Sequence, residues 1–281
     1  MSADAVRFDA LALAGDLEGV LLDARRLAAS APGFHGRRRA GQGEAFWQYR
    51  DHRPEDGARL VDWRRSARGD RFYVRERERE AAQTAWFWID PASGFNWSSD
   101  PKRGTKLRRA RTLTLALAIL LSRGGERVGA LGRPPRRGAH GADRLALDFL
   151  ARPEAEFSAP TASAIVFLSD FYAPVEEWRE RLRKAAAAGC SGALVMIADP
   201  AEEDFPFRGR TLFNEPGSRR EALIGRAENA RELYAERLNS HRRAIHELGA
   251  QYGFPALLHR TDHAAAPILA QLIALVSERF A

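Results

Sequence analysis

Short, almost uninterrupted apolar runs recur between helical segments from residue 84 to the end of the chain. Three of them are TAWFWID at 84–90, AIVFL at 164–168 and ALVMIA at 193–198. Runs of this length without polar alternation are typical of strands buried on both faces. Segments with apolar residues at helical spacing separate them, the clearest at 106–122. The alternation predicts an α/β fold, a doubly wound and mostly parallel sheet with helices on both faces.

Two parts of the chain differ in character. Residues 81–281 carry the alternating pattern and are predicted to form the main α/β domain. Residues 1–80 are predicted to contribute an N-terminal helix and an extended Arg/Asp-rich segment that packs on that domain. The other expected elements are helices over 9–29, 142–151, 174–188, 219–252 with a break near Gly225, and 264–280, strands over 127–131 and 256–259, a loop over 37–43 and a hairpin-like excursion over 205–213.

The positive charge of the chain has two interpretations. The formal net charge is +7, from 44 Lys and Arg against 37 Asp and Glu, and all the basic residues except Lys102, Lys106 and Lys184 are arginine. This balance suits nucleic-acid binding through an Arg-rich face. The acidic residues are interspersed with the arginines, which favours local pairing instead. We therefore expect no nucleic-acid partner and keep such binding as an alternative hypothesis.

Cysteine content and the length of apolar runs exclude several classes of protein. Cys190 is the only cysteine, so the chain has no internal disulfide and no zinc site built on cysteines. The longest apolar run, at 113–121, is far shorter than the roughly 20 residues of a membrane-spanning helix. The N-terminus lacks the basic region and apolar core of a signal peptide. We expect a cytoplasmic protein without a membrane span.

Acidic residues follow three of the predicted strands. Asp90, Asp170 and Asp199 stand at strand carboxyl ends, which meet at the edge of a parallel sheet where ligands bind. Carboxylates in this position are suited to hold a hard cation such as Mg²⁺, and equally to cap the helices that follow. For Asp199, which precedes Pro200, we predict a helix cap. For Asp90 and Asp170 both roles stay open.

The stretch from Gly41 to Arg79 carries Arg, Asp and aromatic residues in a series of fixed spacing. The series is Gly41, Gly43, Glu44 and Phe46, then Arg50, Asp56, Arg59, Val61-Asp62-Trp63, Ser66-Ala67-Arg68 and Val74-Arg75-Glu76. It resembles the signature of the bacterial family called domain of unknown function 58. One position departs from the signature, because Glu55 stands where the family has glycine.

The charged residues of this signature have a structural and a functional interpretation. Asp56, Arg59, Asp62 and Arg68 alternate in sign, and arginine pairs bidentately with carboxylates. Together with the rings of Phe46 and Trp63, they are expected to brace the main domain. A partner-docking surface is the alternative, since Trp and Arg are typical interface anchors.

The family resemblance implies a von Willebrand factor A-like fold with a metal-ion-dependent adhesion site. The first loop of that site reads Asp-x-Ser-x-Ser, and later loops supply a Thr and a second Asp. Here Asp90 and Asp170 match the two acids, Ala92 and Gly94 replace the serines, and no Thr can be placed. The resemblance thus implies a degenerate site of Asp90 and Asp170, which Ser93 reaches if the loop is rearranged. No cofactor is expected beyond a weakly held Mg²⁺.

Three hypotheses about function remain. The resemblance implies a non-enzymatic protein-interaction module, which works with a MoxR-type AAA+ ATPase or its client in the assembly or activation of protein complexes. A metal-dependent hydrolase that uses the strand-end carboxylates is the first alternative, although the sequence contains no complete catalytic constellation. Nucleic-acid binding through the Arg-rich face is the second.

Overall fold

The computed structural model describes residues 40–53, 56–57, 59, 61–67, 69, 71–78, 83–138, 141–149, 158–214 and 220–279, and also residues 26 and 28. The chain divides into two compact units, one made of residues 1–34 and 83–281 and the other of residues 35–82. We call them the main unit and the small unit.

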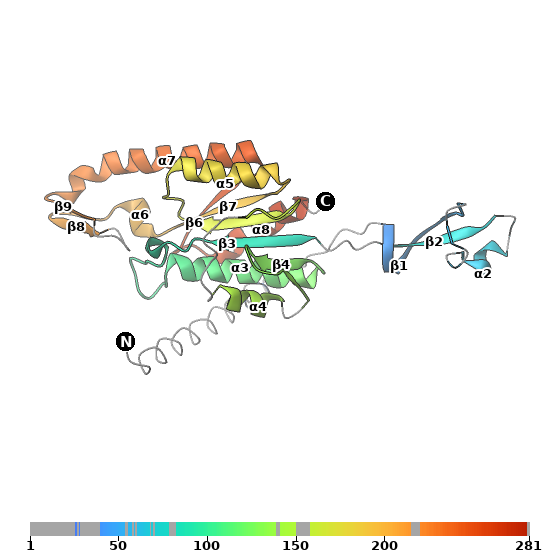
Figure 1. The fold of residues 1–281 in the computed structure, drawn as a ribbon. Helices are drawn as coiled ribbons and strands as arrows, with labels where there is room; N and C mark the ends of the chain where they lie inside the picture. Colours follow the sequence, from blue (N-terminus) through green and yellow to red (C-terminus); the bar gives the residue numbers. More distant parts are fainter. Residues whose placement is uncertain are drawn as a thin grey trace, which may run out of the picture. The chain divides into compact units, whose positions relative to one another are not determined.

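The main unit is built on a six-stranded sheet (Figure 1). Its strands are β3 (Thr84–Ile89), β4 (Arg127–Ala130), β5 (Arg136–Arg137), β6 (Ala164–Ser169), β7 (Ser191–Ala198) and β10 (Ala256–Arg260). They lie in the order β10-β7-β6-β3-β4-β5, and all neighbours are parallel except β4 and β5. Counted along the chain from β3, this is the doubly wound order 3-2-1-4-5-6. The prediction of an α/β fold with a mostly parallel sheet is confirmed.

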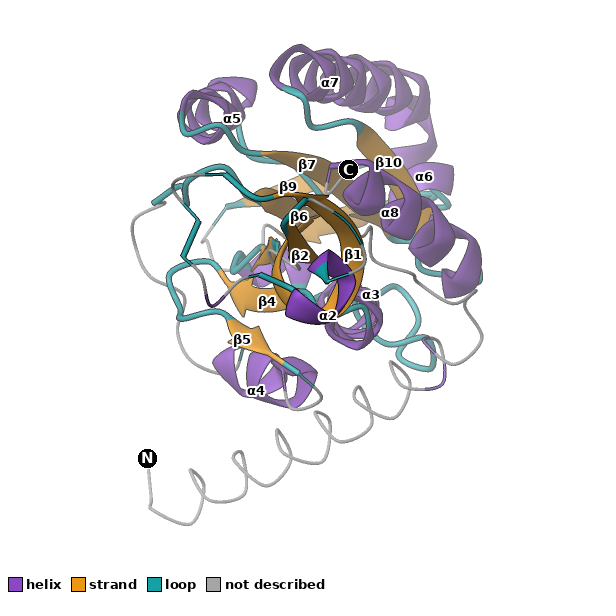
Figure 2. Ribbon diagram, turned by 90° about the vertical axis from the view of Figure 1, so that its right-hand side faces the viewer, coloured by secondary structure: helices purple, strands orange, loops and turns teal. Residues whose placement is uncertain are grey.

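Helices cover both faces of this sheet (Figures 1 and 2). The α-helices from residue 83 onward, within the described ranges, are α3 (Lys106–Arg123), α4 (Gly141–Asp148), α5 (Val175–Ala187), α6 (Pro200–Asp204), α7 (Arg231–Tyr252) and α8 (Ala265–Arg279). Alternate residues of β6 enter opposite cores. Val166 and Leu168 pack with residues of α3, α4 and α8, whereas Ile165 and Phe167 pack with residues of α5 and α7. Both faces of the strand are buried, which explains why its sequence is apolar throughout.

A β-hairpin lies between α6 and α7. The elements of this region are β8 (Thr211–Asn214), β9 (Glu221–Ile224) and the 3₁₀ helix η3 (Ala227–Ala230). Two predictions are wrong here, because the hairpin lies at 211–224 rather than 205–213, and the helix expected from Arg219 begins at Arg231. The charged sequence after Arg219 is compatible with a helix, but β9 satisfies its backbone hydrogen bonds against β8 instead.

The small unit is a two-stranded antiparallel sheet with one helical turn. Its elements are β1 (Ala40–Asp51), α2 (Trp63–Ser66) and β2 (Tyr73–Glu78). The loop predicted over 37–43 is wrong for its last residues, because β1 begins at Ala40 and Gly41 pairs with Arg77. The register shifts between Gly41 and Phe46. Glycine is common at such strand irregularities because it has no side chain to pack.

Two further observations concern helices. Of the helix predicted over 9–29, only Arg26 and Ala28 lie within the described residues, and both are helical. Ala28 is buried in the same core as the inner residues of α3. None of the helices in the described part of the chain has the length and apolar character needed to cross a membrane.

Candidate functional site

The candidate site lies at the carboxyl ends of β3 and β6. These strands are neighbours in the sheet, although β4 and β5 come between them in the sequence. The strand order reverses at this point, and open α/β sheets bind ligands outside the strand carboxyl ends at such a reversal. Asp90 directly follows β3 and Asp170 directly follows β6. Two of the acids predicted from the sequence therefore stand at the topological switch point.

Asp90 accepts hydrogen bonds at both carboxylate oxygens. Its Oδ1 accepts from the backbone N–H of Ala92 at 2.8 Å, and its Oδ2 accepts from Ser169 Oγ. Burial raises the pKa of this carboxyl, and the hydrogen bond from Ser169 opposes the rise. Ser93, by contrast, is exposed at the start of the 3₁₀ turn η2 (Ser93–Phe95). The Asp90 carboxylate thus ties its own loop to the end of β6.

The loop that carries Asp170 is fixed by its neighbours. Ser169 is fully buried, and its Oγ accepts a hydrogen bond from the N–H of Phe171 at 2.8 Å. Phe171 has a φ of 60°, a left-handed conformation that is uncommon for residues other than glycine. Its carbonyl accepts a hydrogen bond from His241 Nε2 at 2.7 Å, and its ring centroid lies 4.4 Å from that of Trp178. These contacts offset the backbone strain and hold Asp170 in place.

Lys106, the first residue of α3, lies between two carboxylates. Its side chain is 1% exposed, and its Nζ donates to Asp170 Oδ2 at 2.8 Å and to Glu202 Oε1 at 2.5 Å. The ring centroids of Phe95 and Tyr172 lie 5.9 Å and 5.2 Å from Nζ, within the range of a cation–π interaction. An ammonium is this deeply buried only with such partners, because an unpaired buried charge is very costly.

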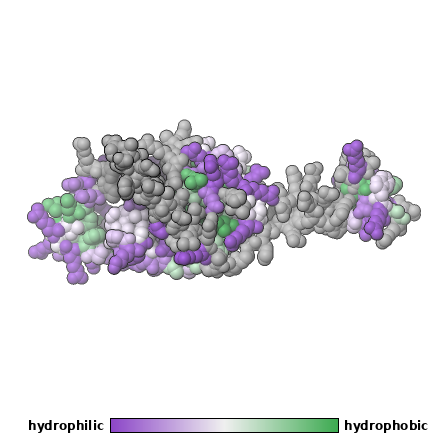
Figure 3. Space-filling model, turned by 90° about the horizontal axis from the view of Figure 1, so that it is seen from below, coloured by the Kyte–Doolittle hydropathy of each residue, from purple (hydrophilic) through white to green (hydrophobic). Residues whose placement is uncertain are grey.

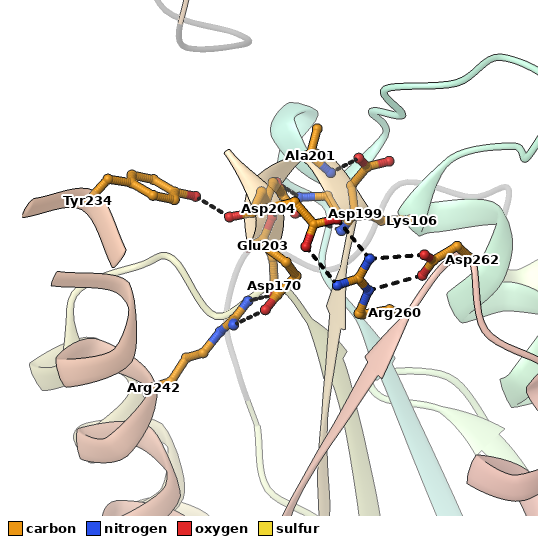
Figure 4. A network of polar contacts seen from close by, with 11 residues as sticks. Lys106, Asp170, Asp199, Ala201, Glu203, Asp204, Tyr234, Arg242, Arg260 and Asp262 are labelled. Atoms are coloured by element: carbon orange, nitrogen blue, oxygen red, sulfur yellow. Dashed lines mark hydrogen bonds and ion pairs between the residues drawn. The ribbon is translucent and has the colours of Figure 1, made fainter. Parts of the chain in front are cut away.

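The short helix α6 contributes three consecutive acids, and each binds a cation from a different element (Figure 4). The ion pairs are Glu202 with Lys106 of α3, Glu203 with Arg242 of α7, and Asp204 with Arg260 of β10. We call these six residues and Asp170 the carboxyl-end network. Burial raises the pKa of Glu202, and the charge of Lys106 opposes the rise. The network fastens α6 to the carboxyl end of the sheet.

Asp199 caps α6, as predicted from the sequence. Its Oδ1 accepts a hydrogen bond from the N–H of Ala201 at 2.9 Å, and the N–H of Asp199 donates to Glu202 Oε2 at 2.8 Å, which completes a capping box. Its Oδ2 accepts from the N–H of Ser99 at 3.0 Å. The carboxylate therefore accepts from a backbone donor of α6 and from one in the loop that contains Ser99.

The three residues predicted as metal ligands have different surroundings. Asp90 accepts two hydrogen bonds, Asp170 binds an ammonium, and Ser93 is exposed. Within the described ranges, no group of three His, Cys, Asp or Glu side chains is arranged to hold a metal ion. Metal binding by this set stays a prediction, which calorimetric titration with Mg²⁺ or Mn²⁺ would test.

Lys106 and Glu202 are absent from the site predicted from the sequence, although two signals point to them. Lys106 is one of three lysines in a chain with 44 basic residues, and the compact charge of lysine differs from the planar fork of arginine. Glu202 follows Asp199 by three residues, which is the spacing of a capping box. Neither signal indicates that the two side chains meet.

His259 lies on β10, two residues before Thr261. The residue is 4% exposed, and its Nε2 has no hydrogen-bond partner among the described residues. The pKa of His259 is lowered to about 4, mainly by burial and also by the charges of Arg109 and His263, whereas the charge of Asp262 opposes the shift. The imidazole is therefore neutral in the folded protein at neutral pH.

Acid is expected to destabilise the main unit through His259. An unfolded histidine binds a proton below pH 6.5, whereas the folded protein excludes that proton down to about pH 4. As the pH is lowered through this window, the free energy of unfolding therefore decreases, by about 3 kcal/mol in total. In urea unfolding between pH 7 and pH 4, the free energy of unfolding of His259→Leu should depend less steeply on pH than that of the wild type. His246→Leu, at an exposed position of α7, should keep the pH dependence of the wild type. Parallel pH profiles for the wild type and His259→Leu would contradict this role.

In the small unit, two signature residues hold the helical turn α2 against the sheet. Asp62 caps the turn, since its Oδ1 accepts from the N–H of Arg65 at 3.1 Å and its Oδ2 accepts from Tyr49 Oη at 3.2 Å. Ser66 is buried, and its Oγ donates to the Asp62 carbonyl at 2.8 Å and accepts from the N–H of Tyr73 at 2.9 Å. These contacts give both residues a structural role within the unit.

The other signature residues lie outside the contacts that hold α2. Asp56 Oδ2 accepts a hydrogen bond from the N–H of Arg53 at 2.8 Å, and Arg59 is exposed. The remaining ones are Phe46 and Arg50 in β1, Arg75 in β2, and Arg68, which lies outside the described residues.

Trp63 and Phe72 form an exposed aromatic pair on the small unit. Their exposed fractions are 58% and 56%, and their ring centroids lie 5.8 Å apart at an interplanar angle of 74°. The ring centroid of His52 lies 6.3 Å from that of Phe72. Contiguous exposed aromatic surface of this kind often marks an interaction site.

Comparison with known proteins gives relatives without an assigned function. The chain is 27% identical over 273 residues to the uncharacterized proteins Rv1480 of Mycobacterium tuberculosis and Mb1516 of Mycobacterium bovis, across 85% of this chain and 80% of theirs. Two solved structures each align with 70% of this chain and 100% of their own. They are the conserved hypothetical protein BatB from Bacteroides thetaiotaomicron (TM-score 0.38, 13% identity) and an aerotolerance-related membrane protein from Bacteroides fragilis (TM-score 0.37, 10% identity).

The family model described as protein of unknown function DUF58 matches residues 48–244. This range contains most of the signature series and most of the main unit, so it agrees with the resemblance seen in the sequence. The chain therefore belongs to the DUF58 family.

Proposed function

We propose that this protein is an interaction module that works with a MoxR-type AAA+ ATPase, or with a client of that ATPase, in the assembly or activation of protein complexes. The partner class comes from the resemblance to proteins with a von Willebrand factor A-like fold that are associated with such ATPases. The cytoplasm is the compartment we propose for it. The observation that carries the proposal is the exposed pair of Trp63 and Phe72.

The composition around this pair suits a protein interface. Trp63 is followed by Arg64 and Arg65, which are both exposed, and Trp and Arg are enriched among the residues that dominate binding energy. The guanidinium of Arg65 lies over the ring of Tyr49, 4.3 Å from its centroid. This contact and the cap of α2 by Asp62 hold the turn that presents Trp63, so a partner meets a preorganised surface.

The carboxyl-end network also favours binding over catalysis. Its carboxylates pair with buried or half-buried cations, whereas a general acid or base must exchange protons with a substrate. A metal-dependent hydrolase that uses Asp90 and Asp170 stays the alternative hypothesis. Hydrolysis of generic phosphate esters with Mn²⁺, abolished by Asp170→Ala, would support that alternative.

A second apolar surface lies on the β8–β9 hairpin. Leu212 and Leu223 stand opposite each other in the two strands and are 52% and 56% exposed. Figure 3 shows hydrophobic residues gathered at the end of the main unit that carries this hairpin. Phe213 stacks on Phe205, with ring centroids 5.8 Å apart, so the hairpin is anchored while its two leucines stay exposed. This surface gives the main unit a contact area of its own for a partner.

Replacing Trp63 by alanine is expected to weaken binding to a MoxR-type ATPase by about tenfold or more, and Phe72→Ala is expected to act in the same direction. Truncation removes aromatic area that the partner would bury. The measurement is a titration with the ATPase in its nucleotide-free, ADP-bound and ATP-analogue-bound states. Leu258→Ala, at a 50% exposed position of the main unit, is the matched control and should bind as the wild type does.

Two results would contradict this proposal. Wild-type protein that binds the ATPase in no nucleotide state would refute the partner. Unchanged affinity in both aromatic variants would refute the exposed pair as the docking surface.

A further inference from the structure

We propose that the ammonium of Lys106 is the cation of the candidate site at the carboxyl ends of β3 and β6. The site then keeps its charge balance and shape without a divalent metal. Two carboxylates from separate elements, Asp170 after β6 and Glu202 in α6, approach one Nζ atom at 2.8 Å and 2.5 Å. The ammonium is the point at which these elements meet. The inference is independent of the proposed partner, because its test is the stability of the protein alone.

Two features of the position of Lys106 are unfavourable for a positive charge. It is the first residue of α3, where the helix dipole disfavours positive charge, and the first turn of α3 contains no acid to compensate. Its side chain is 1% exposed, so the ammonium has lost nearly all of its water, at a large cost in free energy. Among the described residues, the carboxylates of Asp170 and Glu202 offset both penalties, with a smaller contribution from the nearby aromatic rings.

Two carboxylate oxygens approach Nζ at distances close to those of metal–oxygen bonds. Calcium binds carboxylate oxygens at about 2.3–2.6 Å with flexible geometry, and Mg²⁺ is commonly held by one or two carboxylates with waters completing its shell. An ion at the Nζ position would need only a slight inward shift of the oxygens of Asp170 and Glu202. Lysine, with one compact charge, fits such a point better than the broad fork of arginine would.

This arrangement makes opposite predictions for the wild type and for a variant without the ammonium. In the wild type, Lys106 repels a second cation from the same carboxylates. In Lys106→Ala, Asp170 and Glu202 are left without their shared cation, and removal of three methylene groups and the ammonium leaves room for water. Mg²⁺ is commonly bound through one or two carboxylates and several waters, and Mn²⁺ and Ca²⁺ also take carboxylate oxygens as ligands. The variant is therefore expected to gain a dependence on divalent ions that the wild type lacks.

Thermal unfolding in EDTA and in millimolar MgCl₂, MnCl₂ or CaCl₂ tests this inference. The Tm of the wild type should be the same in all these solutions. The Tm of Lys106→Ala in EDTA should be lower on the order of 10 °C, and at least one of the cations should restore about half of that loss. The double variant Lys106→Ala with Glu202→Gln keeps one carboxylate and should show no recovery.

Arg242→Ala is the matched control. It removes the cation that pairs with Glu203, the neighbouring acid of α6. Two carboxylates pair with Lys106, whereas Glu203 is the one described carboxylate in an ion pair with Arg242. Its Tm should fall and should not recover with divalent ions. Recovery in this control would show that the cations act non-specifically on the acidic residues of α6, and would overturn the assignment.

Two other results would overturn the inference. Saturable stabilisation of the wild type by a divalent ion, lost in Asp170→Asn, would show that a metal is the native occupant. Failure of every cation to stabilise Lys106→Ala would show that the carboxylates do not form a cation site. If Lys106→Ala is unfolded in all solutions, the same titration on Lys106→Asn, which keeps a neutral donor, decides the question, and absence of recovery there also overturns it.

Discussion

Replacing Gly192 by alanine is expected to lower the free energy of unfolding of the main unit by more than about 4 kcal/mol, enough to leave much of the protein unfolded. Gly192 lies in β7 opposite Ile165 of β6. A Cβ atom on Gly192 would lie 1.8 Å from the Ile165 carbonyl oxygen and 2.7 Å from its carbonyl carbon. These are backbone atoms of a central strand, so no side chain is able to rotate away, and the two strands would have to separate.

The measurement is urea unfolding followed by far-ultraviolet circular dichroism, with Gly225→Ala as the control. Gly225 follows β9, nothing lies within 4 Å of a Cβ placed on it, and its φ is outside the left-handed region. The control should change the free energy of unfolding by no more than about 0.5 kcal/mol. A Gly192→Ala variant as stable as Gly225→Ala would mean that β6 and β7 do not approach as closely as described.

Replacing Trp178 by alanine is expected to lower the free energy of unfolding by about 3–5 kcal/mol. The side chain is 1% exposed, and its ring contacts those of Trp88, Phe167 and Phe171, with centroids 5.5 Å, 6.0 Å and 4.4 Å away. The guanidinium of Arg181 lies 4.6 Å from the same ring. Truncation leaves a large cavity beneath α5 and removes the support of Phe171, which follows Asp170.

Trp63→Ala is the matched control for this prediction, because the same atoms are removed from an exposed position. Trp63 is 58% exposed, so its replacement should change the free energy of unfolding of the main unit by less than about 0.5 kcal/mol. The two variants are compared by urea unfolding at one pH. Equal stability of both would contradict the burial of Trp178. The expected pattern is a stability loss in one variant and a binding loss in the other.

Local patterns in the sequence identify the elements of the main unit well. The runs at 84–90, 164–168 and 193–198 correspond to β3, β6 and β7, and the helix predicted over 106–122 is α3. These predictions succeed because burial on both faces removes polar residues from a strand, and a helix shows its buried side every three to four residues. The hairpin of β8 and β9 escapes such reasoning, since each strand has only four residues and is largely exposed, so neither shows a buried apolar run.

The candidate site is only partly readable in the same way. Asp90, Asp170 and Asp199 are recognisable as strand-end acids, and the cap formed by Asp199 follows from its position before Pro200. Lys106 and Glu202 are different, because they are 96 residues apart in the chain and meet only in the fold. Which charges become neighbours depends on the strand order, and no local pattern encodes that order.

The sequence by itself therefore determines the family, the α/β class and the positions of the acids at the strand ends. Each of these depends on residues close together in the chain, whose burial or exposure leaves a periodic trace. The tertiary structure alone decides that Asp170 and Glu202 share one buried lysine, because that contact requires α3, β6 and α6 to converge at one point. The free energy of a buried charge depends on the groups that surround it in space, and only the fold brings those groups together.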